Sequence, residues 1–355
     1  MVGTVYVDED IRRLIETSVV NSNEAIDDIQ VQPSSLDLRC GFGKKIWHMP
    51  YSSIPVGNVV DFLDSESTHH FALSETRFLH KRAVYVIELE ESLALPEIIL
   101  AKSNPKSTTG RLDTHTRLIT EDGQGFEDVT LGYNGRLFLE LVSNSLDLFV
   151  PPGFSFNQIR FFNHYGKRLD QGMLEYLARS EPLLLDENKN PIDASKFIRQ
   201  GAVYLTPDLT KPVYKLRDDA PPLNLALGKE SHLASRYFEE VKPGREGLVT
   251  NPGVFYLLRS KEIVRIPKDH CAEMADVLTS LGEFRAHYAG FFDPHFYDFA
   301  TMEYRNTGTT PFLLRHGKPI TSLHFYRLNQ TPKVPYGEER GSSYTGGKVI
   351  ANIFY

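Results

Sequence analysis

The feature that most limits how this chain can fold is an internal repeat. Residues 85–96 and 256–267 share one pattern, in which a run of apolar residues leads to a glutamate and ends at a proline. The two glutamates, Glu91 and Glu262, are 171 positions apart (262 − 91). Self-similarity at a fixed offset is the sequence sign of a repeated structural unit. We therefore expect two diverged copies of one unit.

Two further matches support the repeat and show where the copies differ in length. Glu140 is matched by Glu303 at an offset of 163 (303 − 140), and residues 153–161 are matched by residues 317–325 at an offset of 164 (317 − 153). The offset therefore falls from 171 to 163 along the chain. The first copy has eight additional residues between Glu91 and Glu140.

Both copies are expected to be mostly β. The chain has 21 prolines, 25 glycines, 22 phenylalanines and 17 tyrosines, and its apolar segments are mostly short and bounded by turn residues, which is typical of β architecture. Each copy begins with a short amphipathic helix, for which Asp8 and Asp170 are the expected caps. Residues 163–168 are polar and loop-like, so we place one domain at 1–165 and the other at 166–355.

Charge and composition exclude several classes of protein. The chain has 39 basic and 46 acidic residues and a net charge of −7, whereas a surface that follows a nucleic-acid polymer needs clustered basic residues. The only cysteines, Cys40 and Cys271, are too few for a disulfide framework or a Cys-rich zinc site. No apolar run approaches the ~20 residues that span a bilayer, and no signal-peptide pattern opens the chain. We expect a cytoplasmic protein without membrane contact.

One short cluster has the composition of a phosphate-binding loop. Residues 106–111 combine Lys106, three hydroxyl side chains, a glycine and Arg111. Glycine allows close approach of the backbone, hydroxyls donate to phosphate oxygens, and guanidinium binds bidentately. Clusters of Ser, Thr and Gly are also common in turns and helix caps, so a plain turn is the alternative.

The two copies differ where a binding site would be expected. The second copy reads Leu-Thr-Ser-Leu-Gly-Glu-Phe-Arg over 278–285, without the spacing of the hydroxyl, glycine and arginine residues in 106–111. It has instead an Asp-Pro turn at Asp293, which residues 117–122 of the first copy lack. Each copy therefore retains a different half of the expected site.

The order of these motifs resembles the dCTP deaminase branch of the trimeric dUTPase-like superfamily, and more closely the long, two-repeat dCTP deaminases of alphaproteobacteria. The matching segments cover most of the first copy and parts of the second: 31–41, 106–112, 132–140, 152–161, 282–294 and 336–344. The combination of segments is specific, although no single motif would be.

This resemblance implies two tandem distorted β-barrel repeats, jelly-roll-like, in a homo-oligomer with nucleotide sites between neighbouring subunits. It implies an enzyme of pyrimidine deoxynucleotide metabolism that hydrolyses dCTP to dUTP and ammonia. The family uses a glutamate rather than zinc to activate water, and Mg²⁺ is bound through the substrate triphosphate. No metal ligand is therefore expected from the protein itself.

The resemblance places Ser107 and Arg111 on the family's Ser-x-x-x-Arg loop and Glu140 at its catalytic glutamate. Glu303 is an alternative base, because it follows the better preserved Asp-Pro hairpin. Deamination needs a group that takes a proton from water and protonates the base and the departing amine, and a buried carboxylate can do both. A site that combines the loop of one copy with the hairpin of the other, pairing Glu303 with Ser107 and Arg111, is also possible. A plain edge-strand carboxylate is the alternative for either glutamate.

Six further residues are candidates for substrate binding. A solvated loop is the alternative for Lys106 and Thr108, and a plain Asp-Pro turn is the alternative for Asp293. Lys106 and Thr108 would contact phosphate, Asp293 would accept the deoxyribose 3'-hydroxyl, and His287 is a weaker candidate because a lone histidine is more often structural. The family's closing C-terminal segment corresponds to the region of Tyr344 and Lys348, where the family's glutamine is missing. Alternative functions are a dUTP diphosphatase, a bifunctional enzyme that forms dUMP, and a non-catalytic nucleotide-binding regulator.

Overall fold

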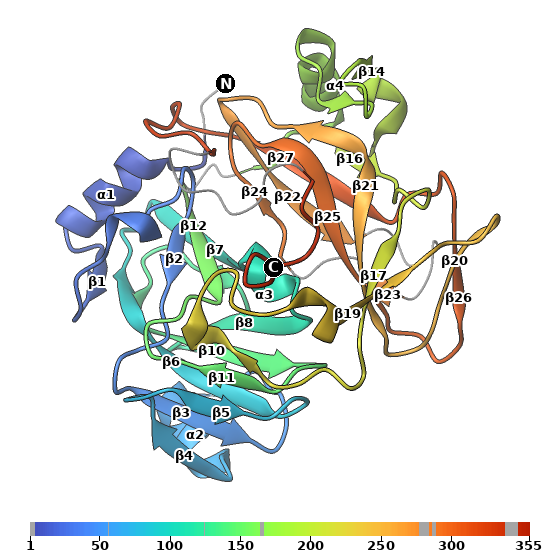
Figure 1. Ribbon diagram of the computed structural model, residues 1–355. Coiled ribbons are helices and arrows are strands. Elements are labelled where there is room, and N and C mark those ends of the chain that lie inside the picture. The colour runs from blue at the N-terminus through green and yellow to red at the C-terminus, as the bar shows by residue number, and fades with distance from the viewer. Residues whose placement is uncertain are drawn as a thin grey trace. The chain divides into compact units, whose positions relative to one another are not determined.

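The computed structural model describes residues 4–55, 57–123, 125–163, 167–276, 284–285, 289–337 and 347–355. Its chain divides into two compact units (Figure 1). The N-terminal unit comprises Thr4–Gly166 with Pro221–Gly228, and the C-terminal unit comprises Lys167–Ala220 with Lys229–Tyr355. A short segment from the second half of the sequence therefore belongs to the N-terminal unit.

Three sheets form the N-terminal unit, and their strands are antiparallel except for β11 and β18. The first contains β1 (Val20–Ser22), β3 (Lys45–Met49), β4 (His69–Ala72), β6 (Val84–Ala94), β8 (Thr114–Thr120) and β10 (Asn134–Ser143). The second contains β2 (Leu36–Leu38), β7 (Ile99–Pro105), β9 (Asp128–Val129) and β12 (Asn157–Asn163), and the third β5 (Arg77–Leu79), β11 (Leu148–Val150) and β18 (Leu223–Asn224). Its helices are α1 (Asp8–Glu16), η1 (Asp28–Gln30), α2 (Val59–Glu66), α3 (Ser107–Gly110) and η3 (Leu225–Leu227).

The C-terminal unit repeats this plan. One sheet contains β13 (Leu184–Leu185), β14 (Pro191–Ile192), β17 (Val213–Leu216), β19 (Phe238–Val241), β21 (Phe255–Arg265), β23 (Phe284–Arg285) and β25 (Tyr297–Asn306). Another contains β15 (Ile198–Arg199), β16 (Ala202–Leu205), β22 (His270–Asp276), β24 (Phe291–Phe292) and β27 (Thr321–Arg327), and β20 (Gly247–Thr250) pairs with β26 (Phe312–Arg315). Its helices are α4 (Gln171–Ser180), η2 (Ala194–Phe197) and η4 (Ala234–Arg236).

The predicted correspondence between the copies is visible in the strand pairing. In the N-terminal unit β6 pairs with β10, and in the C-terminal unit β21 pairs with β25; both ladders contain a register shift. The pair β7 and β12 likewise corresponds to β22 and β27. Glu140 lies on β10 and Glu303 on β25. The expected mostly β fold of two barrel-like repeats is confirmed.

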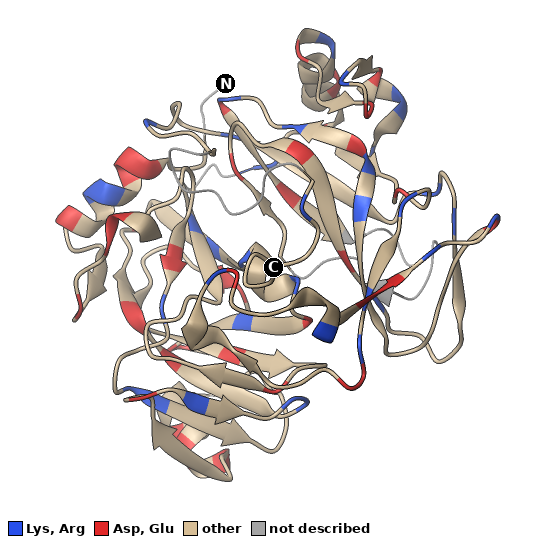
Figure 2. Ribbon diagram, in the orientation of Figure 1, with Lys and Arg blue, Asp and Glu red and all other residues tan. Residues whose placement is uncertain are grey.

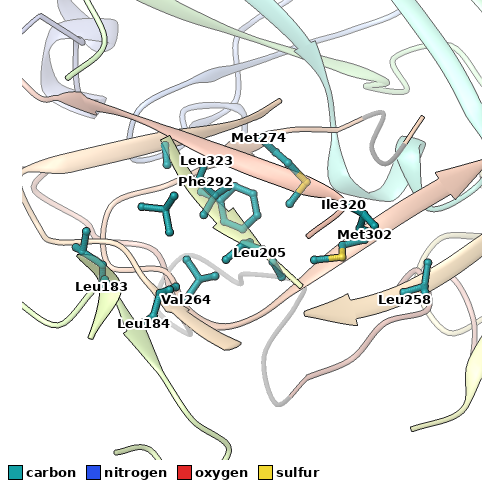
Figure 3. Close-up of a cluster of buried hydrophobic side chains, with 14 of the residues drawn as sticks. Leu183, Leu184, Leu205, Leu258, Val264, Met274, Phe292, Met302, Ile320 and Leu323 are labelled. Atoms are coloured by element: carbon teal, nitrogen blue, oxygen red, sulfur yellow. The ribbon is translucent and has the colours of Figure 1, made fainter. Parts of the chain in front are cut away.

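The core of the C-terminal unit lies between its two larger sheets (Figure 3). Leu258 on β21 and Met302 on β25 are direct cross-strand partners in this core, and Met274 and Leu323 reach it from the other sheet. Because successive side chains of a strand point to opposite faces, a core position at Met302 sends the next side chain, Glu303, to the other face of the sheet. The buried pattern thus fixes the direction of the candidate carboxylate.

Both predicted N-terminal helices are present, but they begin differently. The Asp170 side chain accepts a hydrogen bond of 2.9 Å from the Met173 N–H and caps α4, as predicted. The expected cap at Asp8 is wrong, because Asp8 is already the first residue of α1. The Val7 N–H is satisfied instead by the Asp10 carboxylate at 3.0 Å. None of the helices in the described part of the chain is long and apolar enough to cross a lipid bilayer.

Substitution of Asp170 by alanine is expected to lower the free energy of unfolding by about 1 kcal/mol, because the first turn of α4 loses its side-chain acceptor. Asp170→Asn keeps an oxygen in the same place and should stay within a few tenths of a kcal/mol of the wild type. Urea denaturation of both variants measures the difference. Equal losses in the two variants would rule out the capping hydrogen bond as the cause.

Candidate active site

The predicted phosphate loop is a single helical turn fastened to a neighbouring segment. It follows β7, and α3 is formed by Ser107 to Gly110. The Arg111 N–H donates to the Ser107 carbonyl at 3.1 Å, while the Lys106 N–H and the Thr109 hydroxyl both donate to the Phe156 carbonyl at 2.8 Å. The cluster is therefore both a turn, as composition suggested, and an ordered loop that holds its side chains in fixed places.

The side chains of this loop differ in their surroundings. The Lys106 ammonium forms an ion pair with Asp37, whose side chain is largely buried. Arg111 is buried, whereas Ser107 and Thr108 are partly exposed. The ion pair partly neutralises the charge that Lys106 was predicted to offer a phosphate.

Glu140 is a buried carboxylate that forms an ion pair with the partly exposed Arg117. Its side chain is 2% exposed, and Oε1 accepts a hydrogen bond of 2.9 Å from Nε of Arg117. The two residues are direct partners on β10 and β8. Arg117 also donates to the Ser52 hydroxyl, and its guanidinium carbon lies 3.8 Å from the centre of the Phe126 ring. The carboxylate of the first copy is therefore held by a cation within its own unit.

Glu303 has a different environment in the C-terminal unit. It is 2% exposed, and its Oε2 accepts a hydrogen bond of 2.8 Å from the backbone N–H of Ala289. Asp293 is also buried and begins the predicted turn, in which the Phe296 N–H donates to the Asp293 carbonyl at 3.2 Å and His295 has a φ of +68°. The predicted hairpin is therefore a turn that joins β24, which pairs with β22, to β25, which pairs with β21 and β23 and carries Glu303.

Two other buried glutamates occupy matched positions in the copies. Glu91 accepts hydrogen bonds from Arg39 Nε at 2.8 Å and from the Arg39 N–H at 2.7 Å, and Glu262 accepts from the Thr206 N–H and hydroxyl. Burial raises the pKa of both carboxyl groups, against the opposing effect of these hydrogen bonds. Both glutamates lie at the register shift of their ladder, Glu91 on β6 and Glu262 on β21.

Three candidates belong to the second copy's loops and tail. His287 and Tyr344 lie outside the described residues. Lys348 is exposed, and its ammonium lies 3.4 Å from the Phe354 carbonyl. The preceding Gly347 N–H donates a hydrogen bond of 2.8 Å to the Asp298 carboxylate. The Phe354 side chain is buried, and the centre of its ring lies 4.9 Å from the centre of the Tyr237 ring. The described tail is therefore anchored within the C-terminal unit.

Sequence reasoning missed Arg117 as a residue of the candidate site. Arg117 opens the segment 117–122, for which the sequence analysis considered only the lack of an Asp-Pro turn. Opposite charges that face each other across two strands were the available signal, but reading it requires the register of β8 against β10. That register becomes known only from the structure.

The grouping of possible metal ligands and the distribution of charged residues along the ribbon are two further features of the described part of the chain. No group of three or more His, Cys, Asp or Glu side chains suited to holding a metal ion occurs among the residues that the structure describes. Figure 2 shows Lys and Arg interspersed with Asp and Glu on both units, as on α1. Among these residues, the candidate site offers buried carboxylates and single cations.

Comparison with known proteins gives matches along nearly the whole chain. A family model described as the 2'-deoxycytidine 5'-triphosphate deaminase (DCD) N-terminal domain matches residues 2–165, and the model of the DCD C-terminal domain matches residues 170–352. The crystal structure of 2'-deoxycytidine 5'-triphosphate deaminase from Agrobacterium tumefaciens is similar with a TM-score of 0.84 and 31% identity, covering 94% of this chain and 100% of that one.

Curated relatives match a shorter part. A "dCTP deaminase, dUMP-forming" of Clavibacter michiganensis is 39% identical over 110 residues, which is 30% of this chain and 54% of the relative. A "dCTP deaminase" of Natronomonas pharaonis is 38% identical over 120 residues, which is 33% of this chain and 59% of the relative. The chain thus spans little more than half the length of these two relatives.

Proposed function

This chain belongs to the 2'-deoxycytidine 5'-triphosphate deaminase family, and from that premise we propose that it deaminates dCTP hydrolytically, releasing dUTP and ammonia. The observation that carries the proposal is a buried glutamate, Glu303, on the strand after the Asp293 turn, in a chain matched by both domains of this family. A carboxylate in that environment can accept a proton from water and return it to the substrate.

The reaction balances as dCTP and water giving dUTP and ammonia. The carboxylate takes a proton from water as the oxygen attacks C4 of cytosine, and that proton goes to N3. Collapse of the tetrahedral intermediate breaks the bond between C4 and the amino nitrogen, which leaves as ammonia with a second proton from the water oxygen. Arg111 would stabilise negative charge, Ser107 would orient the water, and Asp293 would accept the 3'-hydroxyl.

The triphosphate of the substrate would be bound by Mg²⁺ and by lysine and threonine side chains. Mg²⁺ would arrive with the triphosphate as part of the substrate, and no residue of the chain is assigned as its ligand. Lys106, Thr108 and Lys348 would lie along the phosphates, with Lys106 exchanging Asp37 for a phosphate oxygen. We further propose that the protein acts as a homo-oligomer in the cytoplasm.

A dUMP-forming enzyme is the second candidate, favoured by the names of several relatives, including those of Clavibacter michiganensis and Streptomyces coelicolor. Such an enzyme would also hydrolyse the bond between the α- and β-phosphates and release diphosphate. The two candidates share the deamination step and differ in the fate of the triphosphate.

Incubation of the protein with dCTP and Mg²⁺, followed by separate measurement of ammonia, dUTP, dUMP and diphosphate, tests these functions. We expect ammonia and dUTP in equal amounts, and loss of turnover when EDTA replaces Mg²⁺. Equal amounts of ammonia, dUMP and diphosphate would establish the second candidate. Diphosphate without ammonia would exclude deamination. Binding of dCTP with turnover no faster than in a Glu140→Gln, Glu303→Gln double variant would indicate a non-catalytic regulator.

A further inference from the structure

Asp113 closes the predicted phosphate loop in a strained backbone conformation. Its φ is +54°, in the left-handed region that favours glycine, and the residue is buried. The Asp113 N–H donates to the Gly110 carbonyl at 3.1 Å, so the residue directly continues the turn of α3. Glycine would adopt this conformation without strain. Aspartate therefore differs from glycine at this position in what its carboxylate contacts.

The carboxylate of Asp113 is bonded to the turn that follows β10. Its Oδ2 accepts a hydrogen bond from the Ser145 hydroxyl, and its Oδ1 accepts one of 3.3 Å from the side-chain amide of Asn144. The backbone carbonyl of Asp113 also accepts from the Asn144 N–H at 3.0 Å and from the same amide at 3.2 Å. Hydrogen bonds to a carboxylate are stronger than those between neutral groups. The side chain of Asp113 thus reinforces an attachment that its backbone already makes.

This attachment joins the loop to the end of a strand that carries a candidate carboxylate, because β10 contains Glu140. The other end of the loop is bonded to the Phe156 carbonyl. Ser107 and Arg111 lie between these two attachments, on a single helical turn. One isolated turn has little stability of its own, so its position depends on the two attachments at its ends.

We infer that Asp113 is a positioning residue for deamination, which holds the loop of Ser107 and Arg111 in a fixed place relative to the strand of Glu140. The inference rests on the proposed function, in which Ser107 orients the water and Arg111 stabilises negative charge. Asp113 acts through the backbone of the loop. A displacement of about 1 Å can lower a rate by about 100-fold, so a small movement of the loop is enough to affect turnover.

Asp113→Gly tests this inference, because it relieves the strained φ, leaves the backbone carbonyl that Asn144 contacts and removes only the carboxylate. We expect kcat for dCTP to fall by about tenfold, with a smaller change in KM, because Ser107 and Arg111 are proposed to act on the reacting atoms. Asp113→Asn keeps an oxygen for the Ser145 hydroxyl and should recover most of this loss. A folded Asp113→Gly variant with kcat within about threefold of the wild type would overturn the inference. Equal losses in the two variants would also overturn it.

Ser145→Ala removes the same hydrogen bond from the other side. We expect its kcat to fall as well, and the double variant with Asp113→Gly to lose no more than Asp113→Gly alone. Additive losses would overturn the inference, because they would show that the two residues affect turnover independently.

The control for the backbone change is Lys189→Gly. Lys189 is exposed in the hairpin between β13 and β14 and has a φ of +65°, so the exchange is the same but lies in the C-terminal unit. This variant should keep the kcat of the wild type. The amount of dCTP bound per chain at saturation gives the folded fraction of every variant, by which kcat is corrected. Absence of ammonia from the wild-type protein would refute the proposed function and with it this inference, whereas wild-type turnover in Asp113→Gly would refute the inference alone.

Discussion

Replacement of Glu303 by glutamine is expected to lower kcat for dCTP deamination by about 10²–10⁴-fold, the range associated with loss of a general acid–base group. Glutamine has the same shape, and its amide oxygen can still accept the hydrogen bond that Ala289 N–H donates at 2.8 Å. The change therefore removes proton transfer while leaving the hairpin in place. The rate of ammonia release at saturating dCTP measures kcat, and KM should change less.

A matched control lies on the neighbouring strand of the same unit. Glu262 is 3% exposed, against 2% for Glu303, and its carboxylate is bonded to Thr206. Because burial raises the pKa of Glu262, the neutral amide of Glu262→Gln should be tolerated, with kcat within about threefold of the wild type. Wild-type turnover in a folded Glu303→Gln variant would mean that another group carries the proton.

The parts of the fold that depend on local sequence could be predicted. Short apolar segments between turn residues predicted the β architecture. The cap at Asp170 could be predicted because the Asp170 carboxylate accepts its hydrogen bond from the N–H of Met173, only three residues later. The repeat could be predicted because Glu91 and Glu262 are identical residues at matched positions, and both are buried at the register shift of a long strand. Membership of the deaminase family likewise confirms the resemblance inferred from the motifs.

Contacts between distant parts of the chain were not predictable in the same way. Asp37 and Lys106 are 69 residues apart in the sequence, and nothing in either local pattern indicates their ion pair. The pairing of Glu140 with Arg117 depends on the register of two strands, and a shift by one residue would turn either side chain to the opposite face. The roles of site residues therefore depend on long-range geometry even where the residue types are read correctly.

The buried carboxyl group of Glu127 should make the free energy of unfolding of the protein depend on pH. Glu127 is only partly buried as a residue, but its Oε2 is enclosed, and no hydrogen-bond partner for that atom is found among the described residues. Burial raises the pKa of Glu127 to about 8, and the opposing effects of hydrogen bonds and of the Lys102 charge are smaller. The folded protein therefore prefers the protonated carboxyl group.

The direction of this pH dependence follows from the pKa of Glu127 in the unfolded and in the folded protein. In the unfolded chain Glu127 ionises near its ordinary pKa of 4.5, whereas in the folded protein it ionises near 8. The stabilisation from its protonated form is thus fully present below about pH 4.5 and is lost as the pH rises to about 8. At about 1.4 kcal/mol per pKa unit, this loss has an upper bound of roughly 5 kcal/mol.

Glu127→Gln fixes the neutral form at every pH, so the variant should gain stability relative to the wild type as the pH rises from about 5 to about 9. Urea denaturation across that range gives the difference between the two proteins, in which the similar contributions of Glu91 and Glu262 cancel. Glu75→Gln, which alters a well-exposed carboxylate, is the control and should show no such trend. A pH-independent difference for Glu127→Gln would mean that this carboxyl group is solvated in the folded protein.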